Sequence, residues 1–314
     1  MRFMQKSEKK ILITGVAGFI GRYVAQHFLA QKWFVIGVDS VSTENAPFPE
    51  LLSYYSMKLP EPALHDVIKK HTPDVCIHCA GSASVGLSVT DPARDLYANT
   101  VLTFEVLNSL RLYAPQCRFI FLSSAAVYGN PKSLPVKETH PLDPISPYGF
   151  HKLQCELLCE EFANVYGMST AILRVFSAYG PGLRRQVLWD ICRKIIIEQS
   201  LTLQGTGNES RDFIHAVDIA RAIDMVTSNA PMKGEVYNLA SGKDVLIREL
   251  ASMILVSFDS TLTPMFSQGL PVGTPSNWRA DISKLNSLGF SVSLPIEQGV
   301  RAYSIWCHAE LTGI

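Results

Sequence analysis

Two residues that could move a proton stand four positions apart in the segment Tyr148-Gly-Phe-His-Lys152. Side chains at positions i and i+4 share one face of a helix, so this spacing would place the phenol beside the ammonium. A phenol is a poor base at neutral pH, but a nearby positive charge favours the phenolate, which accepts a proton readily. The pair is therefore a candidate catalytic base with its partner. The alternative is a chance pattern at the start of an amphipathic helix.

A glycine-rich turn near the start of the chain could hold a phosphate. Its sequence is Gly15-Val-Ala-Gly18-Phe-Ile-Gly21, and it lies between an apolar strand and an amphipathic helix. Glycines permit a tight turn and a close backbone approach to a pyrophosphate, and the helix N-terminus supplies free N–H groups. Because both flanking elements are expected, the pattern predicts a dinucleotide site.

Asp39 ends the second expected strand. A carboxylate at this place accepts hydrogen bonds from an adenosine ribose diol and repels a 2′-phosphate. No Arg or Lys occurs from Ser40 to Asn45, which favours NAD over NADP. Two alternatives stay open, because Asp39 could be a solvated turn residue and Arg22, directly after Gly21, could meet a phosphate.

Ser123 and Ser124 end the fourth expected strand. Ligands of open parallel sheets bind at the carboxyl ends of the strands, so a serine hydroxyl at this edge could hydrogen-bond a reacting oxygen of the substrate. Together with the glycine turn and Asp39, these serines make a chance origin of the Tyr148–Lys152 spacing a weak alternative.

The elements that would position these groups alternate between strand and helix. Nearly all-apolar strands are expected at Lys10–Thr14, Phe34–Val38, Val75–Cys79, Arg118–Ser123, Ala171–Val175 and Val236–Leu239. Helices are expected at Phe19–Gln31, Ala63–Lys70, Asp91–Leu112 and His151–Tyr166, the last with Leu153, Leu157, Phe162 and Tyr166 on one side. This alternation predicts an α/β fold of the Rossmann type, with a doubly wound parallel sheet covered on both faces.

The pattern loosens after Ser177, where Pro and Gly become frequent. We expect a NAD-binding domain over residues 1–177, with 212–241 returning to it. Residues 178–211 and 242–314 would form a smaller, irregular lobe that binds the substrate and closes over the sheet edge.

The charge balance and the cysteine content of the chain argue against several classes of function. Lys plus Arg number 28 and Asp plus Glu number 28, so a balanced chain offers no general attraction to nucleic acid or an anionic membrane. No stretch approaches the ~20 apolar residues of a membrane span.

The seven Cys, an odd number, lie mostly in apolar segments, as expected of reduced thiols in the cytoplasm. Cys76 and Cys79 sit in a strand-like run where residues three apart diverge, so no metal site is expected.

Read together, these motifs resemble those of a known family. The sequence resembles the NAD-dependent epimerase/dehydratase branch of the extended short-chain dehydrogenases/reductases, and especially the UDP-galactose 4-epimerases. The matching segments, in the family's order, are GVAGFIG, Asp39, IHCAGSASVGLSV, FLSSAAVYG, SPYGFHK, LRVFSAYGPG, SRDFIHAVDIA, VYNLASG and RADISKL.

The resemblance implies roles for single residues. Ser124 would be the catalytic hydroxyl, Tyr148 the base and Lys152 its partner. The implied cofactor-binding residues are Gly15, Ala17, Gly18, Phe19, Ile20, Gly21, Asp39, Ala80, Gly81, Asn99, Ser123, Tyr148 and Lys152. The implied or candidate substrate-binding residues are Val85, Ser124, Ser177, Arg184, Arg185, Arg211 and Asp281, with Arg211 resembling the family's diphosphate-contacting arginine. Arg184 and Arg185 could bind phosphate or form a solvated basic pair.

Several positions depart from the family pattern. Lys58 stands where an Asp usually holds the adenine, and Ser177 stands where Asn is frequent. Ala125 and Ala126 replace the Asp-Glu that follows the catalytic hydroxyl in 4,6-dehydratases. Elimination of water needs that acid/base pair, so dehydration is not expected.

Three functions are left open. The first is an NAD-dependent nucleotide-sugar 4-epimerase, with UDP as the expected nucleotide. The second is an NAD(P)H-dependent reductase of nucleotide-linked 4-keto-6-deoxysugars that uses the same three residues. The third is a non-catalytic NAD-sensing protein, which an intact Ser124–Tyr148–Lys152 set argues against. The resemblance also implies a homodimer in which Asp91–Leu112 and His151–Tyr166 of each subunit form a four-helix bundle.

Overall fold

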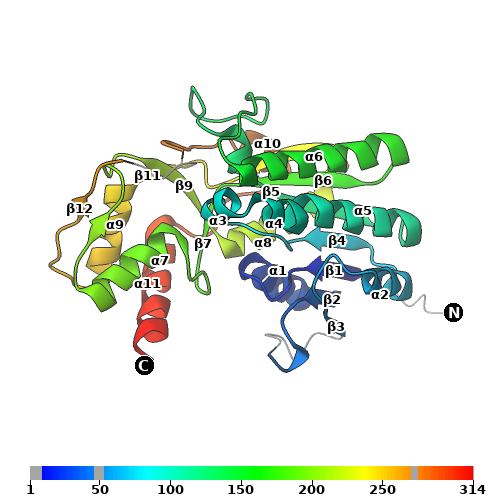
Figure 1. The fold of residues 1–314 in the computed structure, drawn as a ribbon, viewed down its shortest axis with the longest axis horizontal. Coiled ribbons are helices and arrows are strands. Elements are labelled where there is room, and N and C mark those ends of the chain that lie inside the picture. The colour runs from blue at the N-terminus through cyan, green and yellow to red at the C-terminus, as the bar shows by residue number, and fades with distance from the viewer. Residues whose placement is uncertain (1–8, 46–52, 270–274, 314) are drawn as a thin grey trace.

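A seven-stranded parallel sheet forms the larger part of the molecule (Figure 1). The computed structural model describes residues 9–45, 53–269 and 275–313. The strands are β1 (Lys10–Thr14), β2 (Phe34–Asp39), β3 (Ser53–Ser56), β4 (Val75–His78), β5 (Arg118–Ser124), β6 (Thr170–Val175) and β10 (Lys233–Leu239). Their order is β10-β6-β5-β4-β1-β2-β3, so the direction of winding reverses between β1 and β4. This order confirms the expected Rossmann-type fold.

Helices cover both faces of the sheet. One face carries α1 (Phe19–Ala30) and α8 (Ala216–Asn229), and the other carries α2 (Ala63–His71), α5 (Leu102–Tyr113) and α6 (Pro147–Tyr166). Successive strand residues alternate between the two cores, because side chains of a strand point to opposite faces. Cys76 and Cys79 also belong to opposite cores, which confirms the buried-strand interpretation of that pair.

The long helix expected at Asp91–Leu112 consists of three joined segments. These are α4 (Pro92–Leu96), the π-helical turn η2 (Tyr97–Val101) and α5, and α3 (Val85–Thr90) precedes them. Asp91 caps α4 by accepting a 3.0 Å bond from the backbone N–H of Arg94. A π-helical turn widens the helix locally and is frequent at functional sites. Here it contains Asn99, which is buried.

Helix α6 begins four residues earlier than the sequence pattern predicted. Ser146 caps it by accepting a 3.2 Å bond from the N–H of Gly149, and Pro147 occupies the first turn, where its missing N–H costs nothing. Tyr148 therefore already lies in the helix, one turn from Lys152.

The apolar side predicted for α6 is wrong. Phe162 is buried, but Leu157 is 56% exposed and Tyr166 is 49% exposed. The side that faces the sheet instead includes Cys155 and Cys159. The second apolar side of α6 is left open to solvent.

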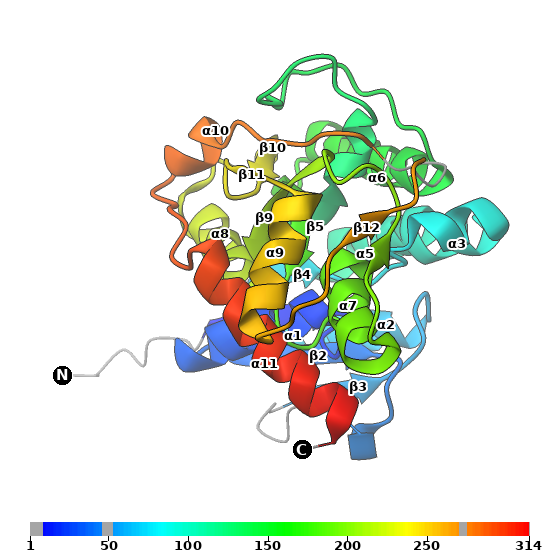
Figure 2. The same ribbon diagram turned by 90° about the vertical axis from the view of Figure 1, so that its left-hand side faces the viewer.

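A smaller lobe lies beside the sheet at the left of Figure 1, and it faces the viewer in Figure 2. Its helices are α7 (Gln186–Arg193), the π-helical η4 (Lys194–Glu198), α9 (Ile247–Ser257) and α11 (Ile296–Thr312), with the short α10 (Ser283–Asn286) under the sheet edge. Its strands are β7 (Ser177–Tyr179), β8 (Thr202–Leu203), β9 (Ser210–His215), β11 (Asp244–Leu246) and β12 (Met265–Phe266). Helices α7, α9 and α11 pack into one hydrophobic core, so this lobe is more helical than its loose sequence pattern indicated.

One buried ion pair joins α6 to the sheet. Arg174 of β6 donates to both carboxylate oxygens of Glu156, at 2.6–3.2 Å, and both residues are about 95% buried. The hydroxyl of Ser123 donates to the same carboxylate at 2.5 Å, and Arg174 also donates to the Tyr128 hydroxyl at 2.8 Å. Because every charged group has partners, the network tolerates its burial.

Replacing one partner of this pair should destabilise the fold strongly. We expect Glu156→Leu to lower the free energy of unfolding by about 3–5 kcal/mol, since it leaves the Arg174 guanidinium buried and unpaired. The double variant Glu156→Leu/Arg174→Met should recover much of the loss. Urea unfolding followed by circular dichroism measures both.

The surface pair Arg193–Glu198, with a 2.8 Å contact, provides the matched control. Glu198→Ala should cost less than about 1 kcal/mol, because exposed ion pairs contribute little. A Glu156→Leu variant as stable as this control would contradict the role given to the buried pair.

Candidate active site

Two adjoining cavities open at the carboxyl ends of β1 and β4. The larger has a volume of about 850 Å³ and runs from the glycine turn to the smaller lobe, and the other has a volume of about 460 Å³. Gly15, Gly18 and Gly81 line both, so the two cavities meet at the glycine turn. The reversal of strand order between β1 and β4 places this junction where α/β sheets bind ligands.

The glycine turn fits a dinucleotide. Gly15 has φ +71°, and a Cβ there would lie 2.6 Å from the backbone N of Ala80. A Cβ on Gly21 would overlap the carbonyl oxygen of Gly15, so side chains are excluded from the turn. Gly18 precedes α1 without a side-chain cap, which leaves the first N–H groups of that helix available to a phosphate.

Asp39 lies in the smaller cavity, as expected of a ribose-binding residue. Its carboxylate accepts bonds from the N–H of Ala17 at 2.9 Å and of Val41 at 3.3 Å, which fix it at the end of β2. Lys58 lines the same cavity. Arg22 lines neither cavity, and its guanidinium donates to the Ala17 carbonyl at 2.8 Å.

A buried histidine that the sequence analysis did not single out joins the two strands beneath the turn. The His78 ring hydrogen-bonds the Thr14 hydroxyl at 2.7 Å and the Thr103 hydroxyl at 3.3 Å. Burial, with a contribution from the Lys152 ammonium, lowers the pKa of His78 to about 3. The neutral ring therefore holds β1, β4 and α5 together without bringing a charge under the site.

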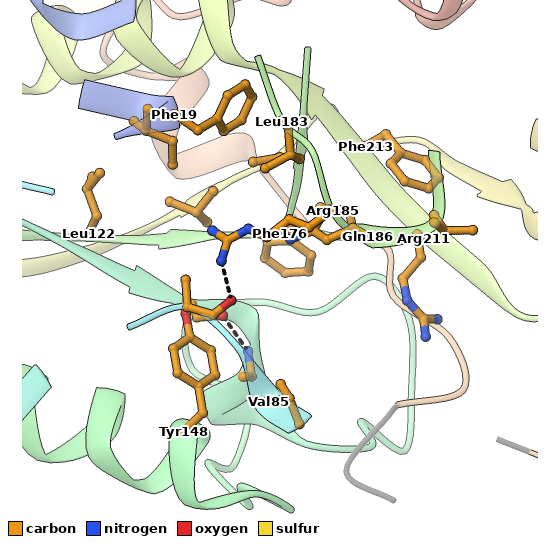
Figure 3. Close-up of a pocket in the computed structure, with 18 of the residues that line it drawn as sticks. Phe19, Val85, Leu122, Tyr148, Phe176, Leu183, Arg185, Gln186, Arg211 and Phe213 are labelled. Atoms are coloured by element: carbon orange, nitrogen blue, oxygen red, sulfur yellow. Dashed lines mark hydrogen bonds between the residues drawn. The ribbon is translucent and has the colours of Figure 1, made fainter. Parts of the chain in front are cut away.

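Tyr148, Lys152 and Ser124 line the larger cavity together. The Lys152 ammonium donates to the carbonyl of Leu122 at 3.0 Å and stands 5.9 Å from the centre of the Tyr148 ring. The Ser124 hydroxyl accepts a 3.2 Å bond from the N–H of Ala126, at the start of the 3-10 turn η3 (Ala125–Tyr128). Figure 3 shows Tyr148 reaching into the cavity from α6.

A buried hydrogen bond between His151 and Asp95 supports the N-terminal part of α6. The His151 ring contacts the Asp95 carboxylate at 2.6 Å, and Asp95 is 2% exposed. The backbone N–H of Tyr148 donates to the Ser88 hydroxyl at 3.1 Å. Helices α3 and α4 thus fix the position of Tyr148 from outside the sheet. Sequence analysis missed this pair, because 56 residues separate its members.

Most of the residues expected at the cofactor and substrate sites line one of the two cavities. They are Gly15, Ala17, Gly18, Phe19, Ile20, Gly21, Asp39, Ala80, Gly81, Val85, Ser123, Ser124, Tyr148, Lys152, Ser177, Arg185 and Arg211. Asn99 lines neither, but a Cβ on Gly81 would lie 2.8 Å from its side-chain oxygen, so it sits directly behind the turn.

Arg184 and Asp281 are not brought to the cavities. Arg184 pairs with Glu310 of α11 at 2.7 Å and lies over the Trp306 ring, on the outer side of the lobe. Asp281 accepts a 2.9 Å hydrogen bond from the N–H of Ser283, the first residue of α10. The chain is extended at Arg185, and consecutive side chains of an extended chain point in opposite directions. The Arg184 and Arg185 side chains therefore point away from each other.

Arg211 lies at the far end of the larger cavity. Its guanidinium donates to the carbonyls of Ser210, Ser276 and Pro275 and stands 5.6 Å from the centre of the Trp278 ring. Burial lowers the pKa of Arg211 to about 10, so the group stays charged at neutral pH. An aromatic ring beside a fixed cation suits a nucleotide, whose base stacks and whose phosphates are anionic.

Sequence analysis also missed several residues that line this end of the cavity. They come from α7, η4, β9, α9 and the loops of the smaller lobe: Gln186, Val187, Asp190, Lys194, Gln204, Glu209, Phe213, Ile247, Pro275 and Trp278. The spacing of Gln186, Asp190 and Lys194, one helical turn apart, could have indicated a polar face that continues from α7 into η4.

Comparison with known proteins agrees with this geometry. A putative UDP-glucose 4-epimerase of Methanocaldococcus jannaschii is 30% identical over 302 residues, which cover 94% of this chain and 97% of that protein. The structure of a UDP-glucose 4-epimerase with UDP-glucose from Thermotoga maritima superposes with a TM-score of 0.89 at 27% identity, covering 96% of this chain and 99% of that one.

A UDP-glucuronic acid 4-epimerase from Bacillus cereus, in complex with UDP-glucuronic acid and NAD, superposes with a TM-score of 0.88 at 25% identity, covering 96% of this chain and 99% of that one. Residues 11–240 match the model of the NAD dependent epimerase/dehydratase family. The resemblance seen in the motifs is thereby confirmed, and the chain belongs to the NAD-dependent epimerase/dehydratase family of enzymes.

Proposed function

We propose that this protein is a UDP-sugar 4-epimerase. The observation that carries the proposal is one continuous cavity that joins the glycine turn, the Ser124–Tyr148–Lys152 group and the Arg211 end. Such a cavity can hold a cofactor and a nucleotide sugar end to end. The names of the similar proteins, which are 4-epimerases of UDP-sugars, support the same reaction.

Tyr148 acts as the base. Its phenolic oxygen takes the proton of the sugar 4-hydroxyl, and Ser124 hydrogen-bonds the same sugar oxygen while the 4-keto sugar exists. NAD held at the glycine turn and Asp39 would supply the oxidising equivalent for sugar C4 and the hydride that reduces the keto sugar from its other face. The cofactor is therefore regenerated in each turnover, and Tyr148 returns its proton to the new hydroxyl.

Lys152 supports this chemistry electrostatically. The Leu122 carbonyl and the Phe121 ring, whose centre lies 4.7 Å from the ammonium, hold the charge close to Tyr148. Lys152 is 6% exposed, so little water screens its charge. A fixed positive charge stabilises the negative charge that develops on a neighbouring oxygen during proton transfer.

Arg211 and the N-terminus of α7 hold the diphosphate. Arg185, which precedes α7, makes no side-chain cap there, so the first N–H groups of the helix are available, and the first turn lines the cavity. An uncapped helix N-terminus favours an anion. With both ends of the nucleotide fixed, the keto sugar can rotate while remaining bound.

The division of labour follows the expected domains. Residues 1–177 with 212–241 bind the cofactor, and 178–211 with 242–314 bind the substrate. The position of β10 in the main sheet and the separate core of α7, α9 and α11 support this division.

The 4-keto-sugar reductase remains the second candidate, because it needs the same three side chains. Arg22 does not favour it, since this guanidinium lines neither cavity and is engaged with a backbone carbonyl. Dehydration is not part of the proposal, because Ala126 lines the cavity without an acid/base group.

Tyr148→Phe tests the catalytic assignment. The variant should retain NAD at the wild-type ratio, since the phenyl ring preserves the packing. Its turnover of UDP-glucose to UDP-galactose should fall by at least about 100-fold, because general base catalysis contributes 10²–10⁴-fold. Nucleotide release on denaturation and product analysis by chromatography measure the two properties. Wild-type turnover by Tyr148→Phe would refute the role of the phenol.

A homodimer through α5 and α6 is also part of the proposal. Both helices present large apolar side chains to solvent: Phe104, Leu112, Leu157, Val165 and Tyr166, each 40–67% exposed. An apolar patch of this kind is typical of a protein interface.

The described residues contain no helix long and apolar enough to cross a membrane. None of the seven cysteines, all within the described ranges, forms a disulfide, which supports the cytoplasmic location proposed.

The dimer is tested by adding a charge to the patch. Leu157→Glu should convert a dimer into a monomer in sedimentation velocity, because a carboxylate cannot be desolvated there without a partner. Val256→Glu on α9, where the side chain is 77% exposed, should leave the oligomeric state unchanged. A wild-type protein that sediments as a monomer would contradict the proposed interface.

A further inference from the structure

The segment 275–281 forms the end of the larger cavity at which Arg211 lies. Pro275 and Trp278 line the cavity. The carbonyls of Pro275 and Ser276 accept hydrogen bonds from the Arg211 guanidinium at 2.6 and 2.9 Å. The position of the guanidinium therefore depends on the position of this segment.

The 3-10 turn η3 connects Ser124 with the same segment. Ser124 caps the start of η3. The carbonyl of Gly129, the residue directly after the turn, accepts a 3.2 Å hydrogen bond from the Trp278 indole N–H. The side-chain oxygen of Asn130 accepts a 3.0 Å hydrogen bond from the backbone N–H of Ser276. One short turn thus has Ser124 at its start and the contacts to the segment just beyond its end.

Tyr128, the last residue of η3, is 1% exposed and its hydroxyl has two partners. The hydroxyl donates to the side-chain oxygen of Asn238 at 2.7 Å and accepts a 2.8 Å hydrogen bond from Arg174. The guanidinium carbon of Arg174 also lies 4.8 Å from the centre of the Tyr128 ring. Burial raises the pKa of Tyr128 to about 12, so the hydroxyl keeps its proton at neutral pH and can donate it to Asn238.

Asn238 of β10 carries this contact on to the 275–281 segment. Its side-chain NH₂ group donates to the Val136 carbonyl at 2.9 Å and to the Asp281 carbonyl at 3.2 Å. Val136 in turn pairs with the segment, since its N–H donates to the Arg279 carbonyl at 2.7 Å and its carbonyl accepts from the N–H of Asp281 at 2.8 Å. Asn238 is fully buried, so its amide cannot turn without leaving polar atoms unpaired.

The Tyr128 hydroxyl therefore connects two groups of buried contacts. On one side, Arg174 donates to Glu156 of α6, whose carboxylate also accepts from the Ser123 hydroxyl. On the other side, Asn238 holds the 275–281 segment. Hydrogen bonds in such a buried network support one another, so a change at the shared hydroxyl affects both sides.

We propose that Tyr128 is a positioning residue that sets the distance between Ser124 and the Arg211 end of the cavity. Tyr128 lines neither cavity, so it acts through Asn238 and the turn η3 and touches no ligand. This inference rests on the proposed function, in which a nucleotide lies at Arg211 while its sugar reaches Ser124. A fixed distance between these two ends keeps the reacting oxygen within reach of the hydroxyl while the nucleotide stays bound.

Tyr128→Phe tests the proposal, because it removes the hydroxyl and keeps the ring beside the Arg174 guanidinium. Calorimetric titration of UDP into the NAD-loaded protein should give a dissociation constant about 5- to 10-fold higher than that of the wild type, since one lost buried hydrogen bond loosens the 275–281 segment. Turnover at saturating UDP-glucose should fall about 10-fold, since Ser124 no longer keeps its distance from the nucleotide. The NAD content should not change.

A double-mutant cycle tests the route through Asn238. Asn238→Ala should also weaken UDP binding, and Tyr128→Phe/Asn238→Ala should bind UDP within about 2-fold of Asn238→Ala alone, because two changes at one contact are not additive. Tyr55→Phe is the matched control. It removes a hydroxyl that contacts the His71 ring at 2.7 Å, on the edge strand at the opposite side of the sheet from β10, and it should change neither UDP binding nor turnover.

The other outcomes overturn the proposal in distinguishable ways. If Tyr128→Phe is less stable in urea but binds UDP and turns over like the wild type, the hydroxyl stabilises the core and positions nothing. If the two substitutions weaken UDP binding independently, Tyr128 does not act through Asn238. If the wild type binds UDP but converts no UDP-glucose, the proposed function fails, whereas the UDP constants of the variants still decide the role of Tyr128. If the wild type does not bind UDP, both fail.

Discussion

The ion pair between Glu156 and Arg174 is the contact on which the geometry of the site depends. It fixes α6 against β6, and through the Ser123 hydroxyl it also fixes the end of β5, next to Ser124. Lys152 lies one turn before Glu156 on the same helix face, with its ammonium held by the Leu122 carbonyl of β5. Tyr148, Lys152 and Ser124 therefore keep their relative positions, because the buried ion pair holds α6 in place against the sheet.

In the proposed function, the two lobes divide binding from chemistry in a way that suits epimerisation. The sheet side offers a glycine turn without side chains and a catalytic group of three polar residues, and the smaller lobe offers α7 and Arg211. A nucleotide anchored at the far end can remain bound while its sugar turns over near Tyr148. The site thus needs firm attachment at the nucleotide and few fixed contacts to the sugar ring.

The sequence predicted well what local rules control. The strands, the glycine turn, Asp39 and the Tyr148–Lys152 spacing are set by periodicity and short motifs, and the structure places them at one sheet edge. Side-chain pairs between distant segments could not be predicted from the sequence, as with Asp95 and His151, or His78 and Thr14. The start of α6 and its exposed side were mistaken, because two apolar sides on one helix cannot be distinguished by spacing alone. Arg184 and Arg185, identical in type, point in opposite directions because the chain is extended there, and residue type alone does not say which of them faces the cavity.

Transfer of the C4 hydrogen within one active site is the central claim, and an isotope experiment tests it directly. UDP-glucose deuterated at C4 is incubated with the purified protein without added cofactor, and the products are analysed by NMR and mass spectrometry. The account predicts UDP-galactose that retains the deuterium at C4, because the hydride leaves and returns through the bound NAD. Absence of epimerised product, together with consumption of NADPH when a 4-keto sugar is supplied, would contradict it and identify a reductase.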